Sequence, residues 1–278
     1  MPQNRPPLFD FSTQQRARDR ARALDGDRFL EAAAAEGLAD RLSAVTRKFE
    51  NGLWIGGETV PPQIRSFAAS WQVADFDAQE VLKSDTGFDL AVSLLSLQWI
   101  NDLPGALVQI RARLKPDGLF VGVLLGGSTL RELREAFAQA EIATLGGISP
   151  RVSPFADVRD LGSLLQRAGF ALPVSDLERL DVRYRDVFTL ARDLRIHGLT
   201  NAMSERSRRP LRRATLAALM AHYGDHHAEG GKLKASFELL YLTGWAPDDS
   251  QQKPLKPGSA KHRLAQALGT DEHPLKER

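Results

Sequence analysis

The sequence predicts an α/β fold in which helices cover both faces of a mostly parallel sheet, a three-layer sandwich. Two continuous apolar runs, residues 88–93 and 119–125, are typical of strands that are buried on both faces. Between them, apolar residues recur at helical spacing over residues 103–114. A glycine pair at 126–127 follows the second run and precedes another amphipathic stretch. Strand, helix, strand, glycine turn and helix in this order indicate βαβ units.

The other elements can be placed from the same hydrophobic pattern. We expect six strands, at residues 52–55, 71–74, 88–93, 119–125, 176–182 and 235–245. We expect helices at residues 27–48, 61–69, 103–114 and 154–168, with a further helix after residue 129. Residues 186–223 are predicted to form a helical insertion that covers the mouth of the sheet before the last strand. Val187, Leu190 and Leu194 carry this prediction because they share one helical face.

The chain is predicted to have three regions. Residues 1–50 form an N-terminal helical region, and residues 51–245 form the α/β domain with the insertion 186–223. Residues 246–278 are rich in proline, lysine and glycine and are expected to form an irregular C-terminal tail. The chain has no internal repeats.

Composition excludes several kinds of protein. With 278 residues, 42% of them hydrophobic, the chain can bury a substantial core. It has no cysteine, which excludes disulfides, thiolate zinc sites and cysteine nucleophiles. Its longest apolar runs are too short to cross a bilayer, so we expect no membrane span. The arginine-rich N-terminus lacks the apolar segment of a secretory signal, and we expect a cytoplasmic protein.

Several motifs resemble one known superfamily. Residues 114–118 read LKPDG, residues 96–104 read SLQWINDLP, and residues 125–133 read LGGSTLREL. Related stretches occur at 149–155, 243–247 and 256–260. The order and spacing of these segments resemble the class I S-adenosylmethionine-dependent methyltransferase superfamily, in its NADH dehydrogenase complex I assembly factor 5 branch. The malonyl-acyl-carrier-protein methyltransferases of biotin synthesis are more distantly similar.

This resemblance implies a Rossmann-like sheet of seven strands with S-adenosylmethionine bound at the carboxyl ends of the first strands. A mitochondrial member of the branch is associated with arginine hydroxylation of a complex I subunit, so the fold alone does not determine the reaction. The residues that match the family's cofactor pocket are Gly56, Gly57, Asp75, Phe76, Ser93 and Leu95. The residues that match its pocket wall are Trp54, Gln98 and Trp99.

The sequence departs from the family where the cofactor would bind. In the family the first strand ends in an acidic residue and a turn with several glycines, which lets the backbone approach the cofactor. Here the acidic position is Trp54, and only Gly56 and Gly57 remain of the turn. Gln98 stands where family members often carry histidine, which removes a possible acid–base group.

The segment that forms the first half of the sheet is also shorter than in the family. Only 17 residues separate Gly57 from Asp75, enough for one crossover between parallel strands, whereas reaching a third strand takes two. We therefore expect the sheet to lack one strand of its N-terminal half. In the alignment we prefer, the second strand is missing and the ribose-binding carboxylate with it. In the alternative, Asp75 or Asp77 is that carboxylate and the third strand is missing.

These departures predict a pseudoenzyme or assembly module that binds a protein partner. The alternative is an active S-adenosylmethionine-dependent methyltransferase, or an arginine hydroxylase-like enzyme, acting on a protein or acyl-carrier substrate. S-adenosylmethionine is the cofactor if the chain is active, and no cofactor is expected otherwise. No catalytic residue can be assigned.

Two further clusters of charged or metal-binding residue types lie in the insertion. A basic run is a candidate macromolecule-binding surface, and its members are Arg206, Arg208, Arg209, Arg212 and Arg213. This run could serve an anionic partner as a second alternative function, but no interleaved aromatic residues support nucleic-acid binding. His222 and His226 are four residues apart, but beyond His227 no acidic or histidine partner stands at a recognisable offset, so no metal site is expected.

Overall fold

The computed structural model describes residues 6–252 and 269–270 of the chain. Residues 1–247 form one compact unit, and residues 248–278 form a second. Most of the predicted irregular tail, including the motif at 256–260, lies outside the described residues.

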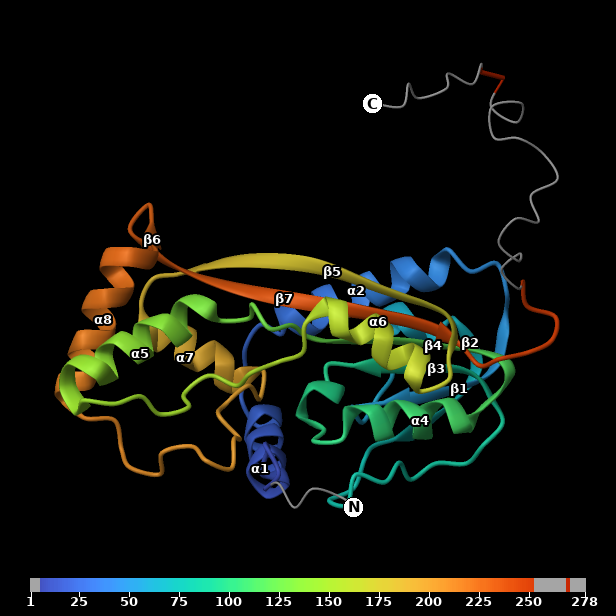
Figure 1. Ribbon diagram of the computed structural model, residues 1–278, viewed down its shortest axis with the longest axis horizontal. Helices are drawn as coiled ribbons and strands as arrows, with labels where there is room; N and C mark the ends of the chain where they lie inside the picture. Colours follow the sequence, from blue (N-terminus) through green and yellow to red (C-terminus); the bar gives the residue numbers. More distant parts are fainter. Residues whose placement is uncertain (1–5, 253–268, 271–278) are drawn as a thin grey trace, which may run out of the picture. The chain divides into compact units, whose positions relative to one another are not determined.

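A single sheet runs through the first unit in the order β2-β1-β3-β4-β7-β5 (Figure 1). Its strands are β1 (Phe49–Ile55), β2 (Ala68–Ala74), β3 (Phe88–Leu94), β4 (Leu114–Leu125), β5 (Ala171–Tyr184), β6 (Ala228–Glu229) and β7 (Lys232–Trp245). The pairings among β2, β1, β3 and β4 are parallel, while β7 runs antiparallel to both β4 and β5. All six predicted strands are present, and each is longer than its apolar segment. The seventh strand, β6, is a two-residue hairpin partner of β7.

Helices cover both faces of this sheet. They are α1 (Phe11–Arg22), α2 (Phe29–Ser43), α3 (Pro62–Arg65), α4 (Leu103–Arg113), α5 (Arg131–Leu145), α6 (Val158–Arg167), α7 (Val187–Ile196) and α8 (Arg213–His227), with a 3-10 turn η1 (Leu97–Trp99). Buried residues of α2, α5, α7 and α8 form one core with one face of the sheet. Those of α4 and α6 form the other (Figure 1). Alternate residues of a strand point to opposite faces, so Trp54 belongs to the first core while Leu53 and Ile55 belong to the second.

The outer edge of the N-terminal half is one strand short, as predicted. β2 pairs directly with β1, with Gly52 opposite Trp71 and Ile55 opposite Ala74. In doubly wound nucleotide-binding sheets the second strand lies beside the first and the third lies outside it. Among the described residues only one strand, β2, lies outside β1, and it would take this place whether it derives from the second or the third strand of such a sheet. As the chain length predicted, one short crossover containing α3 joins β1 to β2.

Several helix boundaries differ from prediction. The segment expected to be helical over 27–48 is α2, which ends at Ser43, and the helix expected over 61–69 is the four-residue α3 because β2 already begins at Ala68. α6 begins at Val158, where the Asp157 side chain accepts from the Arg159 backbone N–H at 2.9 Å, and not at Pro154. α1 lies in the region 1–50 that was expected to be helical, but no separate helix was predicted at its position. Its buried residues are small or polar, namely Thr13, Gln14, Ala17 and Ala21, so it has no apolar stripe to detect.

The predicted insertion consists of α7 and α8, joined by residues 197–212. Val187, Leu190 and Leu194 on α7 are buried, as is Leu219 on α8. None of the helices in the described part of the chain has both the length and the apolar content needed to span a bilayer.

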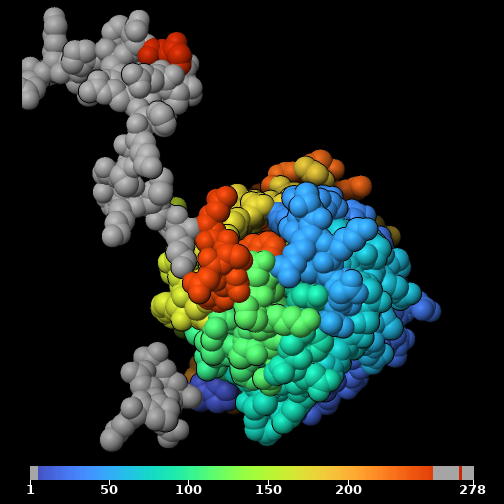
Figure 2. Space-filling model, turned by 90° about the vertical axis from the view of Figure 1, so that its right-hand side faces the viewer, coloured from blue at the N-terminus to red at the C-terminus, as the bar shows by residue number. Residues whose placement is uncertain are grey.

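The amino ends of the parallel strands β1, β2, β3 and β4 lie on the face shown in Figure 2, where the segment before β1 (light blue) meets the start of β4 (green). Arg47 Nη1 lies 2.7 Å from Asp117 Oδ2 at this end. The candidate site lies at the other end of the strands, because nucleotide-type ligands bind at carboxyl ends.

Candidate cofactor cleft

The carboxyl ends of β1, β2 and β3 lie side by side at one end of the sheet. Each strand is followed directly by a residue that matches the family's cofactor pocket. Gly56 follows β1, Asp75 follows β2 and Leu95 follows β3. In open α/β sheets, ligands bind at the carboxyl ends of the strands. The structure therefore brings together residues that are up to 39 positions apart in the sequence.

Two cavities lie at these carboxyl ends, and together they are called the strand-end cleft below. One has a volume of about 270 Å³ and is lined by Gly56, Gly57 and Leu95 among others. The second has a volume of about 490 Å³, and its lining includes Asp75 and Phe76. Arg18 of α1 and Trp99 of η1 line both cavities. Small-molecule sites typically occupy roughly 300–1,000 Å³, so the strand-end cleft has room for a cofactor-sized ligand.

Gly56 is required by the turn itself. Its φ is +100°, and a Cβ at this position would collide with the side chain of Ser96. A Cβ on Gly57 would lie 3.2 Å from Trp54 Nε1, a tight contact but not a backbone restriction. Because sterics within the fold explain Gly56, this residue is not evidence that a cofactor binds.

Helix α1 places two arginines against carboxylates of the strand-end cleft. Arg18 Nη1 lies 2.8 Å from Asp75 Oδ2, and the Arg18 and Asp75 side chains are 21% and 44% exposed. The other oxygen of Asp75 accepts from the Phe76 backbone N–H at 2.9 Å. Arg22 Nη1 lies 3.1 Å from an oxygen of Glu58, in the turn after β1. Both carboxylates therefore already have cationic partners from the chain itself.

Comparison with known proteins identifies the family. A model described as a methyltransferase domain matches residues 9–173, more than half of the chain. The Arginine-hydroxylase NDUFAF5, mitochondrial, of Danio rerio is 37% identical over 285 residues, which covers 93% of this chain and 88% of that protein. This chain belongs to the methyltransferase-domain family.

Other relatives are matched over a smaller part of their length. The NDUFAF5 arginine-hydroxylase of Homo sapiens is 40% identical over 76% of this chain and 59% of its own. The Malonyl-[acyl-carrier protein] O-methyltransferase of Xylella fastidiosa is 39% identical over 62% of this chain and 56% of its own. Apart from the Danio rerio protein, the chain thus spans about half the length of these relatives. The YcgJ protein of Bacillus subtilis is similar in structure, with a TM-score of 0.48 at 13% identity over 77% of this chain and 99% of that one.

Three residues that match the family's pocket do not line the strand-end cleft. Trp54 is 1% exposed and packs edge-on against Trp71 in the core, because strand alternation turns its side chain toward the α2 face. Ser93 is fully buried, with its Oγ 2.9 Å from that of Ser96. Gln98 is buried and donates to the Leu95 carbonyl at 2.8 Å. Trp54 and Gln98 were expected in the pocket wall, but neither lines the two cavities of the strand-end cleft.

Trp99 is the predicted pocket-wall residue that does line the strand-end cleft. Its ring packs edge-on against Phe9 at 5.3 Å and against Phe155 at 6.0 Å between centroids. It also lines a third, mostly apolar cavity of about 210 Å³ beneath α7, with Leu125 and Leu190. Sequence reasoning missed this cavity, although the amphipathic spacing of α7 was its signal.

The basic run does not act as one surface. Arg206 is 17% exposed and donates to the Met203 carbonyl and to Thr13 Oγ1, each at 2.8 Å, so it ties the insertion to α1. Arg208 lines the larger cavity of the strand-end cleft. The other three members are exposed at the start of α8, namely Arg209, Arg212 and Arg213.

Proposed function

We propose that this methyltransferase-family protein binds S-adenosylmethionine weakly or not at all and serves as a binding or assembly module for a protein partner. The observation that carries the proposal is the ion pair between Arg18 and Asp75 inside the strand-end cleft. Asp75 follows the strand in the second position, where the family's ribose carboxylate is expected. A charge-assisted hydrogen bond from a guanidinium is stronger than one from a neutral ribose hydroxyl. A ribose would therefore have to displace Arg18.

The loss of two polar contacts to the cofactor would lower the affinity for S-adenosylmethionine strongly. Hydrogen bonds to charged groups contribute about 1.5–3 kcal/mol each. Losing two such contacts, at Trp54 in place of the acidic residue and at the occupied Asp75, weakens binding by roughly 10²- to 10⁴-fold. A site of micromolar affinity would then become millimolar. The strand missing from the N-terminal half removes a further part of the wall.

Isothermal titration calorimetry with S-adenosylmethionine and S-adenosylhomocysteine tests this proposal. We expect no saturable binding below about millimolar ligand for the wild-type chain. Arg18→Ala frees Asp75 and should bring binding into the measurable range, whereas Arg20→Ala, an exposed arginine of the same helix, should not. A micromolar dissociation constant for the wild type would overturn the proposal. A weaker affinity of the Arg18→Ala variant would show that Arg18 is a cofactor ligand and not a competitor.

The second candidate is an active S-adenosylmethionine-dependent enzyme. Its support is the second-strand position of β2, which retains a carboxylate at Asp75, and the apolar cavity that adjoins Trp99. The relatives' names suggest two reactions for such an enzyme, arginine hydroxylation of a protein and methylation of a malonyl group on an acyl carrier. We propose a cytoplasmic location for either candidate, and a protein as the partner ahead of a nucleic acid.

A further inference from the structure

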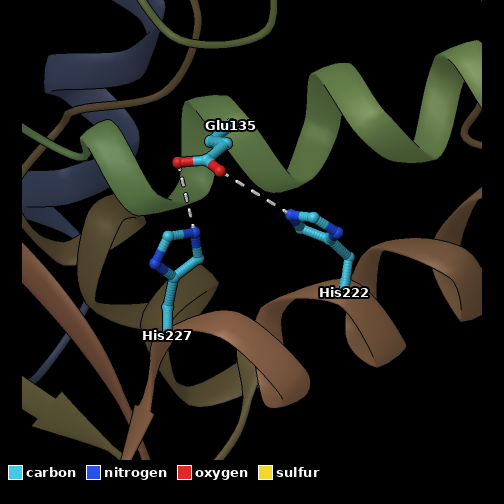
Figure 3. A group of neighbouring side chains, drawn as sticks. All are labelled: Glu135, His222 and His227. Atoms are coloured by element: carbon cyan, nitrogen blue, oxygen red, sulfur yellow. Dashed lines mark ion pairs between the residues drawn. The ribbon is translucent and has the colours of Figure 1, made fainter.

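Three metal-ligand side chains meet where α5 packs on α8 (Figure 3). Glu135 comes from α5, and His222 and His227 come from α8. The Nε2 atoms of His222 and His227 lie 4.0 and 3.5 Å from separate oxygens of Glu135. The three ligand atoms all lie within 4.8 Å of one another.

The sequence could not show this cluster, because its acidic member is distant along the chain. Glu135 precedes His222 by 87 residues and reaches it only through helix packing. The pair that sequence spacing indicated, His222 and His226, is not the pair that converges. His226 stacks on His222 with ring centroids 4.0 Å apart, and its Nδ1 lies 3.1 Å from the His222 carbonyl oxygen. The second ligand is His227, the last residue of α8.

Both histidine nitrogens are buried and lack a hydrogen-bond partner. The Nε2 atoms of His222 and His227 have no partner within hydrogen-bonding geometry, although both side chains are less than one-fifth exposed. Buried polar atoms in native proteins are almost always satisfied, so two adjacent exceptions facing one carboxylate require a partner. A cation between the three atoms would satisfy both nitrogens and the carboxylate together.

The donor set matches zinc. Two imidazole nitrogens and one carboxylate oxygen are a common zinc ligand set, with a fourth position left to water. Metal–ligand bonds of ~2.0–2.1 Å in a tetrahedron place neighbouring ligand atoms ~3.4 Å apart. The 3.5 and 4.0 Å separations run to the two different oxygens of Glu135, and a set of one atom per residue lies within 4.8 Å, so the ligands would have to draw closer around an ion. Glu135, whose side chain is 56% exposed, is free to adjust. A cavity of about 350 Å³ adjoins Glu135 and His227 and gives water access to the fourth position.

We propose that Glu135, His222 and His227 bind a zinc ion that cross-links α5 to α8. The ion would connect α8 of the helical insertion to α5, the helix that follows β4. Because it binds the folded arrangement and not the unfolded chain, it would raise the stability of the protein.

Metal titration of the tag-free, full-length, chelator-treated chain tests the proposal. We expect Zn²⁺ to bind one-to-one with about micromolar or tighter affinity, measured by competition with a chromogenic chelator. Co²⁺ should give the intense visible absorption of a tetrahedral site. Zinc should also raise the melting temperature of the wild-type chain.

Variants separate this site from adventitious binding. Glu135→Gln changes an exposed side chain and should fold normally, yet lower zinc affinity at least about tenfold. His222→Gln and His227→Gln should do the same, while His226→Gln, the matched control on the same helix, should change the affinity by less than about threefold. Absence of saturable binding, or equal affinity in Glu135→Gln and the wild type, would overturn the proposal. In that case the three side chains form only ion pairs between protonated histidines and the carboxylate.

Discussion

At the scale of single residues, the strand-end cleft contains both a residue that the fold requires and a residue that core packing does not require. Gly56 belongs to the first kind, since its positive φ and the closeness of Ser96 exclude any side chain. Asp75 belongs to the second kind, because its side chain is solvent-accessible and follows β2 outside the core. The Arg18 guanidinium that binds it comes from a helix with no counterpart in the predicted fold. Retention of a family residue therefore indicates function only where packing does not already explain it.

Substituting the two turn glycines separates these roles. Gly56→Ala should lower the free energy of unfolding by about 2–4 kcal/mol, because it combines left-handed strain with a steric clash. Gly57→Ala should cost less than about 1 kcal/mol, since only the Trp54 indole must shift slightly. Urea denaturation of both variants measures the difference. Equal destabilisation of the two would contradict the assignment of strain to Gly56 alone.

At the scale of elements, a buried carboxylate on α5 holds the loop that follows this helix. Glu141 is fully buried and accepts from the Ser149 backbone N–H at 2.6 Å and hydroxyl at 2.7 Å. Arg151 Nε also donates to it at 2.7 Å. Burial raises the pKa of Glu141, but the hydrogen bonds from Ser149 and the nearby Arg151 outweigh it, so the pKa lies below its ordinary value. The loop also contributes Arg151 and Val152 to the lining of the apolar cavity beneath α7.

This network should make stability depend on pH. Because the folded pKa of Glu141 is lower than the unfolded value of about 4.3, its contribution is present above that value. It is lost as pH falls through the folded pKa. Glu141→Gln should lower the unfolding free energy by about 3 kcal/mol at pH 7 and by less near pH 3. Urea midpoints across this range provide the test, with Glu135→Gln in metal-free buffer as the control on the same helix. A difference that did not change with pH would mean that ionisation of Glu141 is not the source.

At the scale of the whole molecule, a net charge of +2 conceals a local concentration of arginine at the start of α8. Arg209, Arg212 and Arg213 are exposed, and no ion pair is found for them among residues 6–252 and 269–270. Unpaired cations that lie close together attract anionic partners more strongly than the same charges dispersed. This surface is where we expect an acidic segment of a protein partner to bind.

Elution from immobilised heparin measures that local charge. The triple variant Arg209→Ala, Arg212→Ala and Arg213→Ala should elute at clearly lower salt than the wild type. A control with the same change of net charge replaces three scattered exposed arginines, Arg20, Arg159 and Arg192. The control should elute closer to the wild type than the α8 variant does. Coincident elution of the two triple variants would show that net charge alone governs binding.

The sequence by itself determined the fold class, the six long strands and the shortened N-terminal half of the sheet. These features follow from local hydrophobic period and chain length, which are properties of neighbouring residues. Only the tertiary structure showed that β2 pairs directly with β1, because this pairing depends on contacts between distant segments. The same reason applies to the direction of the Trp54 side chain, the ion pair of Arg18 with Asp75, and the meeting of Glu135 with His222. Each of these contacts joins residues that tertiary packing brings together, and their spacing in the sequence does not predict that they are close.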